Sequence, residues 1–202
     1  MASIILASQS PRRKMLLEWA RVSFEVIVSE SNEEFPASLT KQEVPIYIAL
    51  QKALAVKEKV KNGNLKNNLN NQYDVNACIV AADTIVVLEN EILEKPLNRD
   101  HAIDSLLKLA GKTHQVITGV SILYQSEIYS FSETTQVTFH PLTKSQIEFY
   151  VDEYKPYDKA GGYAIQEWIG VVGIQSIQGD FYNVMGLPVS SLLQQLQKLK
   201  VI

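Results

Sequence analysis

The sequence has 202 residues, which is enough for one sizeable core or for two lobes that share one. A net charge of -3 and the lack of a Lys/Arg run give no indication of a nucleic-acid partner, and a hydrophobic content of 46% is ordinary for a globular protein. No apolar run approaches membrane-spanning length and the first residues lack a signal-peptide pattern, so we expect no membrane partner. The single cysteine, Cys78, excludes an internal disulfide and fits a cytoplasmic location.

The first predicted elements are a strand and a helix joined by a short turn. Ile4 to Leu6 form the apolar run of a buried strand. Ser10 is a favourable N-cap residue and Pro11 suits the first helical position, so we expect a helix from Pro11 to about Ala20.

Arg12 and Arg13 stand in the first turn of that helix, where the partial positive charge of the helix end favours acidic residues instead. Together with the hydroxyls of Ser8 and Ser10 and the free backbone N–H groups, they predict an anion site, with phosphate as the expected ligand. The alternative is a pair of solvated arginines on a surface helix.

An acidic loop and a lysine-containing helix follow. A strand is expected from Phe24 to Val28, and the polar segment Ser29 to Glu34 comes directly after it. Because strand-end loops of α/β proteins line ligand crevices, this segment is either a metal-binding loop or a solvated one. Apolar spacing predicts a helix from Val44 to about Lys61, in which Lys52 alone would simply be solvated. Asn62 to Asn71 holds six asparagines and is expected to be a loop or insertion.

The segment Ala77 to Glu94 carries an acid inside an apolar strand. Every residue from Ala77 to Leu88 is apolar or β-branched except Asp83, and Glu89-Asn90 is typical of a hairpin turn. Burying a carboxylate is costly unless it is paired or binds a metal. Asp83 is therefore either a structural acid with a paired cation or backbone group, or a metal ligand or general base, and we favour the second interpretation.

The second half of the chain alternates helices with strands, which predicts an α/β fold with a mixed sheet. His114 and His140 lack a metal-binding spacing and are interpreted as structural or exposed. The expected elements are a helix from Arg99 to Ala110 closed by Gly111, strands at Gln115 to Tyr124 and Ile128 to Phe139, a helix capped by Thr143 that ends near Tyr154, a strand-like Val171 to Ile177, and a helix from Val189 to Leu199.

The segment Asp158 to Gln166 reads D-K-A-G-G-Y-A-I-Q. Gly161 and Gly162 would let the backbone approach a ligand closely, and the alternative is a turn that enters a strand. Cations and acids that gather in one cleft would suit a polyphosphate with a divalent metal. No P-loop or dinucleotide-binding glycine motif is present. The charged residues in apolar or turn contexts are Arg12, Arg13, Glu33, Lys52, Asp83, Lys95 and Lys159.

Seven short motifs in order resemble the Maf family of nucleoside triphosphate pyrophosphatases. They cover nearly the whole chain apart from the asparagine-rich stretch. The motifs are S-x-S-P-R-R at Ser8 to Arg13, A-x-x-K-A at Ala49 to Ala53, A-D-T-I-V at Ala82 to Val86, E-K-P at Glu94 to Pro96, G-K-T-H-x-V at Gly111 to Val116, D-K-A-G-x-Y-x-I-Q at Asp158 to Gln166, and V-M-G-L-P at Val184 to Pro188.

The resemblance implies one Maf-like domain over residues 1–202, with an insertion at about 62–71. Its fold would be a mixed β-sheet with flanking helices, in two lobes around a central cleft, as in inosine triphosphatases. Its activity would be hydrolysis of nucleoside triphosphates to monophosphate and pyrophosphate with Mg, Mn or Co as a divalent cation. The family has also been linked to housecleaning of non-standard nucleotides and to arrest of cell division. A homodimer is left open.

The resemblance also implies roles for individual residues. Asp83 would be the catalytic base, and Glu33 with Asp83 would hold the metal. The phosphate-binding residues would be Ser8, Arg12, Arg13, Lys52 and Lys95, and the residues that select the substrate would be Arg12, Thr84, Lys159 and Gln166. The amide of Gln166 offers a donor and an acceptor, which suits the imide edge of a pyrimidine.

The form K-A-G-x-Y-x-I-Q resembles the branch of the family that acts on dTTP and UTP. The acidic loop S-E-S-N-E-E differs from the usual S-G-x-D-E, so the metal ligand is either Glu33 or Glu34. Gln166 is followed by Glu167-Trp168 where a glycine is common, which would reshape the base pocket. Two other classes stay open, namely a nucleotide-binding regulator without turnover and a phosphatase that releases the γ-phosphate.

Overall fold

The computed structural model describes residues 3–28, 33–63, 73–74 and 76–202. The chain divides into two compact units. The first comprises Met1–Asp83, Thr118–Ser132 and Gly186–Ile202, and the second comprises Thr84–Ile117 and Glu133–Met185. Most of the asparagine-rich stretch lies outside the described residues, so its interpretation as an insertion stays a prediction.

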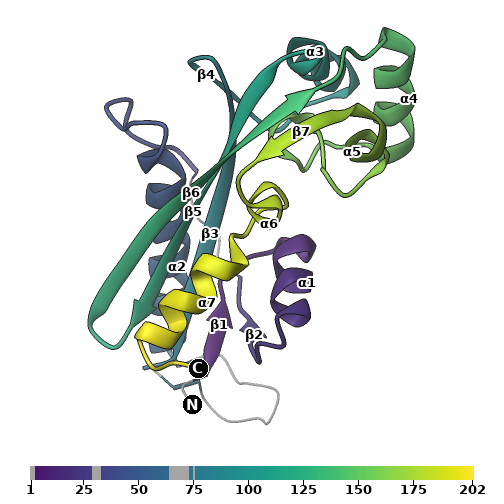
Figure 1. Cartoon of the computed structure of the whole chain (residues 1–202). Coiled ribbons are helices and arrows are strands. Elements are labelled where there is room, and N and C mark those ends of the chain that lie inside the picture. Colours follow the sequence, from purple (N-terminus) through teal and green to yellow (C-terminus); the bar gives the residue numbers. More distant parts are fainter. Residues whose placement is uncertain (1–2, 29–32, 64–72, 75) are drawn as a thin grey trace. The chain divides into compact units, whose positions relative to one another are not determined.

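The strands form a seven-stranded mixed sheet in the order β2-β1-β3-β5-β6-β7, with β4 paired to β3 (Figure 1). Strand β1 pairs in parallel with β2 and β3, whereas the β3–β4 and β6–β7 pairs are antiparallel. This confirms the predicted mixed α/β fold. The strands are β1 (Ile4–Leu6), β2 (Glu25–Val26), β3 (Cys78–Leu88), β4 (Glu91–Leu93), β5 (Thr113–Tyr124), β6 (Glu127–Phe139) and β7 (Ile174–Gln178).

The helices follow the predicted boundaries closely up to residue 154. Ser10 caps α1, Asn98 caps α3, and Thr143 forms the predicted capping box with Gln146. Gly111 has a φ of +71°, as expected for a glycine that ends a helix. The helical segments are α1 (Pro11–Trp19), α2 (Glu43–Lys61), α3 (Arg99–Leu109), α4 (Lys144–Tyr154), η1 (Ala160–Gly162), α5 (Trp168–Gly173), α6 (Phe181–Val184) and α7 (Val189–Lys198).

The strand predicted at Val171 to Ile177 is partly wrong, because α5 occupies its first half and β7 begins only at Ile174. Two adjacent valines favour a strand, but the chain forms a short helix here. A Cβ on Gly170 would lie 1.7 Å from the carbonyl oxygen of Ile165, so only glycine lets this helical turn pack against that backbone. Val171 is 82% exposed.

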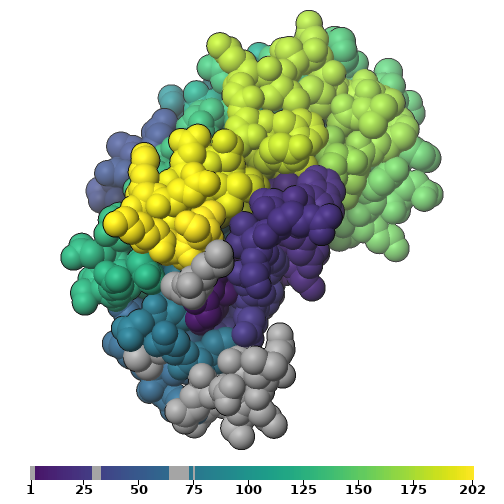
Figure 2. Space-filling view, turned by 60° about the horizontal axis from the view of Figure 1, so that its bottom comes forward, coloured from purple at the N-terminus to yellow at the C-terminus, as the bar shows by residue number. Residues whose placement is uncertain are grey.

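The core of the first unit lies between α2 and the sheet. Ala49, Ala53 and Val56 of α2 pack in one cluster with Ile5 of β1 and Ile79 of β3. Gly119 of β5 allows the start of α2 to come close, since a Cβ there would lie 2.2 Å from the backbone nitrogen of Ile46. Helices α1 and α7 lie side by side, with α7 yellow and the N-terminal segment purple (Figures 1 and 2).

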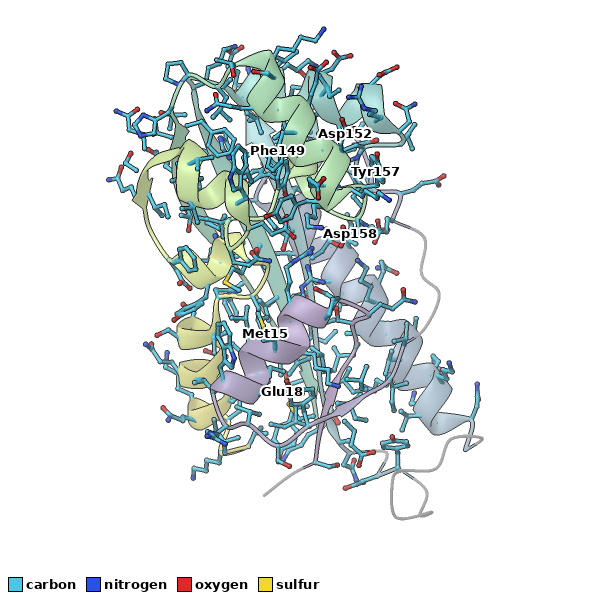
Figure 3. The ribbon with its side chains drawn as sticks, turned by 90° about the vertical axis from the view of Figure 1, so that its right-hand side faces the viewer. Met15, Glu18, Phe149, Asp152, Tyr157 and Asp158 are labelled. Atoms are coloured by element: carbon cyan, nitrogen blue, oxygen red, sulfur yellow. The ribbon has the colours of Figure 1, made fainter. Side chains whose placement is uncertain are left out.

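The second unit is built on α3 and α4, which pack against each other. Arg99 of α3 donates two hydrogen bonds to the carboxylate of Asp152 on α4, at 2.6 and 2.8 Å. Asp152 is labelled in Figure 3, together with Phe149 on the same helix. Within the described residues, no helix is both long enough and apolar enough to span a membrane.

Candidate functional site

The turn between β1 and α1 holds the side chain of Arg13 in a fixed position. Its Nη1 donates to the Ser8 hydroxyl at 3.2 Å and its Nε donates to the carbonyl oxygen of Gly186 at 2.8 Å. The Ser10 hydroxyl accepts from the backbone N–H of Arg13 at 3.4 Å, and the first turn contains no acidic residue. The predicted arrangement of serines, arginines and helix start is therefore present, and its use as an anion site stays a prediction.

Charged neighbours act on Arg13. Burial lowers the pKa of its guanidinium, nearby Asp83 raises it, Arg12 lowers it and Glu33 raises it. An arginine stays protonated in proteins all the same. The two arginines and the two acids thus lie close enough to interact electrostatically, within one unit of the chain.

Lys52 lies between two carboxylates from separate elements. Its Nζ is 2.7 Å from Oδ1 of Asp83 on β3 and 2.8 Å from Oε1 of Glu33. The side chain of Asp83 is 11% exposed and that of Lys52 is 17% exposed, whereas that of Glu33 is 48% exposed. The buried aspartate therefore has a paired cation, which offsets the cost of burying its charge.

The alternation of β3 explains where Asp83 points. Ala77, Ile79 and Ala81 face α2 in the core cluster, and every second residue of a strand faces the same side. Asp83 is the next residue in that row, so it also faces α2. Lys52 precedes the buried Ala53 on that helix and reaches this end of the row.

The donor set at Glu33 and Asp83 fits a hard divalent cation. Within the described residues, no group of three or more His, Cys, Asp or Glu side chains gathers as a metal site. Mg²⁺, however, is usually bound through only one or two carboxylates together with water and substrate phosphates. The two carboxylates already share the ammonium of Lys52. Glu34 instead lines an open pocket of about 600 Å³ beside α2, together with Phe35 and Tyr47.

The remaining predicted site residues belong to the second unit. Thr84 follows Asp83 in β3 and is half-buried, and Lys95 is exposed just after β4. Lys159 is buried, with its Nζ 2.7 Å from Oδ1 of Asp158. Gln166 is exposed immediately after the buried run 161–165.

Two polar arrangements of the second unit were not predicted from the sequence. Glu167 and Tyr150 form a hydrogen bond next to Lys159. His114 is buried with its Nε2 2.7 Å from the hydroxyl of Tyr163, and its ring meets Phe139 edge-on. Burial lowers the pKa of His114 to about 4 and raises that of Tyr163. Glu167 could be noticed from the sequence, because it stands where the family motif commonly has a glycine. Nothing in the sequence pointed to Tyr150.

Several known proteins are similar to this chain. The dTTP/UTP pyrophosphatase of Cytophaga hutchinsonii is 46% identical over 97% of this chain and 84% of that protein. The dTTP/UTP pyrophosphatase of Bacillus cereus is 44% identical over 100% of this chain and 97% of that one. The solved structure of the Staphylococcus aureus Ham1 protein matches with a TM-score of 0.42 and 16% identity, over 68% of this chain and 71% of that chain. The sequence model of the family described as Maf-like protein matches residues 3–199, and the chain belongs to that family.

Proposed function

We propose that this protein hydrolyses dTTP and UTP to the nucleoside monophosphate and pyrophosphate. The names of relatives that match nearly the whole chain, dTTP/UTP pyrophosphatases, support this substrate class. The observation that carries the proposal is the buried carboxylate of Asp83, which is held by Lys52 at 2.7 Å and interacts with the charge of Arg13. Simple phosphate binding would need the cations but no buried base.

In this proposal, Asp83 accepts a proton from water, or orients that water, as its oxygen attacks the α-phosphorus. A bond from the water oxygen to the α-phosphorus forms, the bond from the α-phosphorus to the bridging oxygen breaks, and pyrophosphate leaves with the bond electrons. Arg12, Arg13, Lys52 and Lys95 would stabilise the negative charge that develops on the leaving group. Ser8 would keep the guanidinium of Arg13 in place.

Glu33 and Asp83 would hold the divalent cation, Mg, Mn or Co, with Lys52 giving way to it. Such a cation neutralises phosphate charge and polarises phosphoryl oxygens when it is bound. We prefer Glu33 to Glu34 as the second ligand of the cation, because the carboxylate of Glu33 already shares the ammonium of Lys52 with Asp83.

Arg12, Thr84, Lys159 and Gln166 are proposed to select the base and sugar. The exposed amide of Gln166 can donate and accept at the imide edge of a pyrimidine. A single-domain organisation, a cytoplasmic location, a homodimer, removal of non-standard nucleotides and a link to cell-division arrest remain expectations from the family.

A panel of nucleoside triphosphates assayed for pyrophosphate and for orthophosphate tests the proposal. We expect pyrophosphate from dTTP and UTP, with much slower reaction of purine nucleotides. In ¹⁸O-water the label should enter the nucleoside monophosphate. Label in pyrophosphate would place the attack at the β-phosphorus, and labelled orthophosphate would make the protein a γ-phosphatase. Tight nucleotide binding without any product would make it a regulator.

A further inference from the structure

The hydroxyl of Tyr150 connects two points of the segment 159–167. Tyr150 lies in α4 and is fully buried. Its oxygen accepts a hydrogen bond from the backbone N–H of Ala164 at 3.1 Å, and its O–H donates to Oε2 of Glu167. One rigid side chain therefore fixes both the backbone before Gln166 and the side chain after it.

The second carboxylate oxygen of Glu167 faces Lys159. The distance from Oε1 to Nζ is 3.6 Å, and the Lys159 side chain is only 9% exposed. Asp158 binds the same ammonium at 2.7 Å, from a position just beyond α4 that is labelled in Figure 3. Two carboxylates thus share one ammonium, which holds this lysine in one place.

Glu167 occupies the N-cap position of α5 without making a side-chain capping bond. Helix N-caps favour Ser, Thr, Asp and Asn, whose short side chains reach the free N–H groups of the first turn. Here the longer side chain reaches Tyr150 and Lys159 instead. The carboxylate of Glu167 therefore stabilises the segment before the helix and does not cap the helix.

We infer that Glu167, braced by Tyr150, is a positioning residue that sets base selectivity by fixing Lys159 and the backbone that presents Gln166. This inference rests on the proposed function, in which Lys159 and Gln166 select the substrate. Glu167 acts through them and has no part in the attack on phosphorus. It follows that a loss of this carboxylate changes which nucleotide is chosen far more than how fast a bound one reacts.

Glu167→Gln and Tyr150→Phe test the inference, because both keep the side-chain shape. We expect kcat for UTP to change little and KM to rise, so that the ratio of kcat/KM for UTP over GTP falls by about 10- to 100-fold, as for loss of a hydrogen bond to a charged group. Glu153→Gln and Tyr154→Phe make the same chemical changes at exposed positions of α4 and should leave the ratio unchanged. Thermal unfolding of all four variants identifies any that are simply unstable.

Lys159→Met, alone and combined with Glu167→Gln, separates positioning from a general structural effect. If Glu167 acts in part through Lys159, the loss of selectivity in the double variant should be smaller than the sum of the losses in the two single variants. Additive losses, or an unchanged ratio in both Glu167→Gln and Tyr150→Phe, would overturn the inference.

Binding of the α,β-imido analogues of UTP and GTP, measured by calorimetry, keeps this test independent of turnover. A wild-type protein that releases no pyrophosphate would refute the proposed function. In that case the positioning role would still be tested by binding, because it requires the variants to lose their preference for the uridine analogue. A wild-type protein that is active and selective, with equally selective variants, would refute only the positioning role.

Discussion

Each unit of the molecule holds one lysine between two carboxylates, but the two arrangements differ in how their acids are fixed. Around Lys52 the acids come from distant parts of the chain, Glu33 and Asp83, and Glu33 is half exposed. Around Lys159 the acids are near neighbours in sequence, and Glu167 is also bound by the buried Tyr150. The structural difference is the hydrogen bond from the buried Tyr150, which holds the carboxylate of Glu167 in one position.

A lysine that lies between two carboxylates therefore does not indicate one particular function. Its role depends on what else touches the acids. Asp83 lies near the guanidinium of Arg13, whose own hydrogen bonds fix it at a helix start, and this suits chemistry on phosphate. Glu167 has an aromatic hydroxyl and a helix start as its neighbours, which suits positioning.

The largest effect is expected from removing the charge at the first lysine cluster. Asp83→Asn keeps the volume but loses basicity and a metal ligand, so turnover of UTP should fall by about 10²- to 10⁴-fold, the usual worth of a general base. Nucleotide binding, measured by calorimetry, should fall much less. Asp158→Asn makes the same change at the second cluster and should keep most of the activity. Near-normal turnover of Asp83→Asn would refute the base assignment and turn attention to Glu33 or Glu34.

Acid should weaken the second unit through His114. Its pKa is about 4 in the folded protein against an ordinary value of 6.5, so between these values the unfolded chain binds a proton that the folded chain does not. Stability from this group is present above about pH 6.5 and is lost as the pH falls toward 4, by about 3 kcal/mol in total. Urea unfolding at several pH values should show this slope in wild type and in the exposed control His140→Gln. A His114→Gln variant with the same slope would contradict the assignment.

Gln166→Glu tests whether Gln166 selects the base and takes no part in catalysis. A carboxylate cannot donate to the pyrimidine imide, so kcat/KM for UTP should fall by about 10- to 100-fold, as expected when a polar recognition contact is lost. Gln178→Glu places the same charge at an exposed position of β7 and should have no effect. A wild-type preference for a modified purine nucleotide such as 7-methyl-GTP over UTP would show that the assignment to the dTTP and UTP branch is wrong.

The smallest effect is expected from replacing Asn62 to Asn71 with a short Gly/Ser linker. The stretch has little to bury, and polar loops tolerate changes in length at a small entropic cost. The midpoint of thermal unfolding and the turnover number should both stay close to wild type. A large loss of either would show that the stretch is needed for folding or for catalysis.

Local chemistry made most of the fold predictable. Ser10-Pro11, the capping box at Thr143 and the apolar run before Glu89-Asn90 each specify an element through its own residues, and all three were confirmed. The failure at Val171 has a different cause. Gly170 comes close to the carbonyl of Ile165, only a few residues earlier in the chain, and the run of apolar residues does not indicate this tight turn.

The candidate site was likewise predictable where a residue stood out from its neighbours in sequence, and not where its role depends on a distant contact. A carboxylate in an apolar strand must find a partner, so Asp83 stood out from its neighbours. Its partner Lys52 looked like any solvated helical lysine, because the contact joins residues 31 positions apart. Tyr150 likewise gave no signal, since buried tyrosines are ordinary core residues until their hydroxyl partner is seen.

The lone thiol of Cys78 has a practical consequence for labelling. Cys78 is fully buried in β3, and burial raises the pKa of its thiol to about 12, so the reactive thiolate is absent at neutral pH. The folded natural sequence should therefore behave toward maleimides as if it had no cysteine. A cysteine introduced at Val171, which is 82% exposed, would carry a fluorophore alone, and any second label taken up would report the opening of β3.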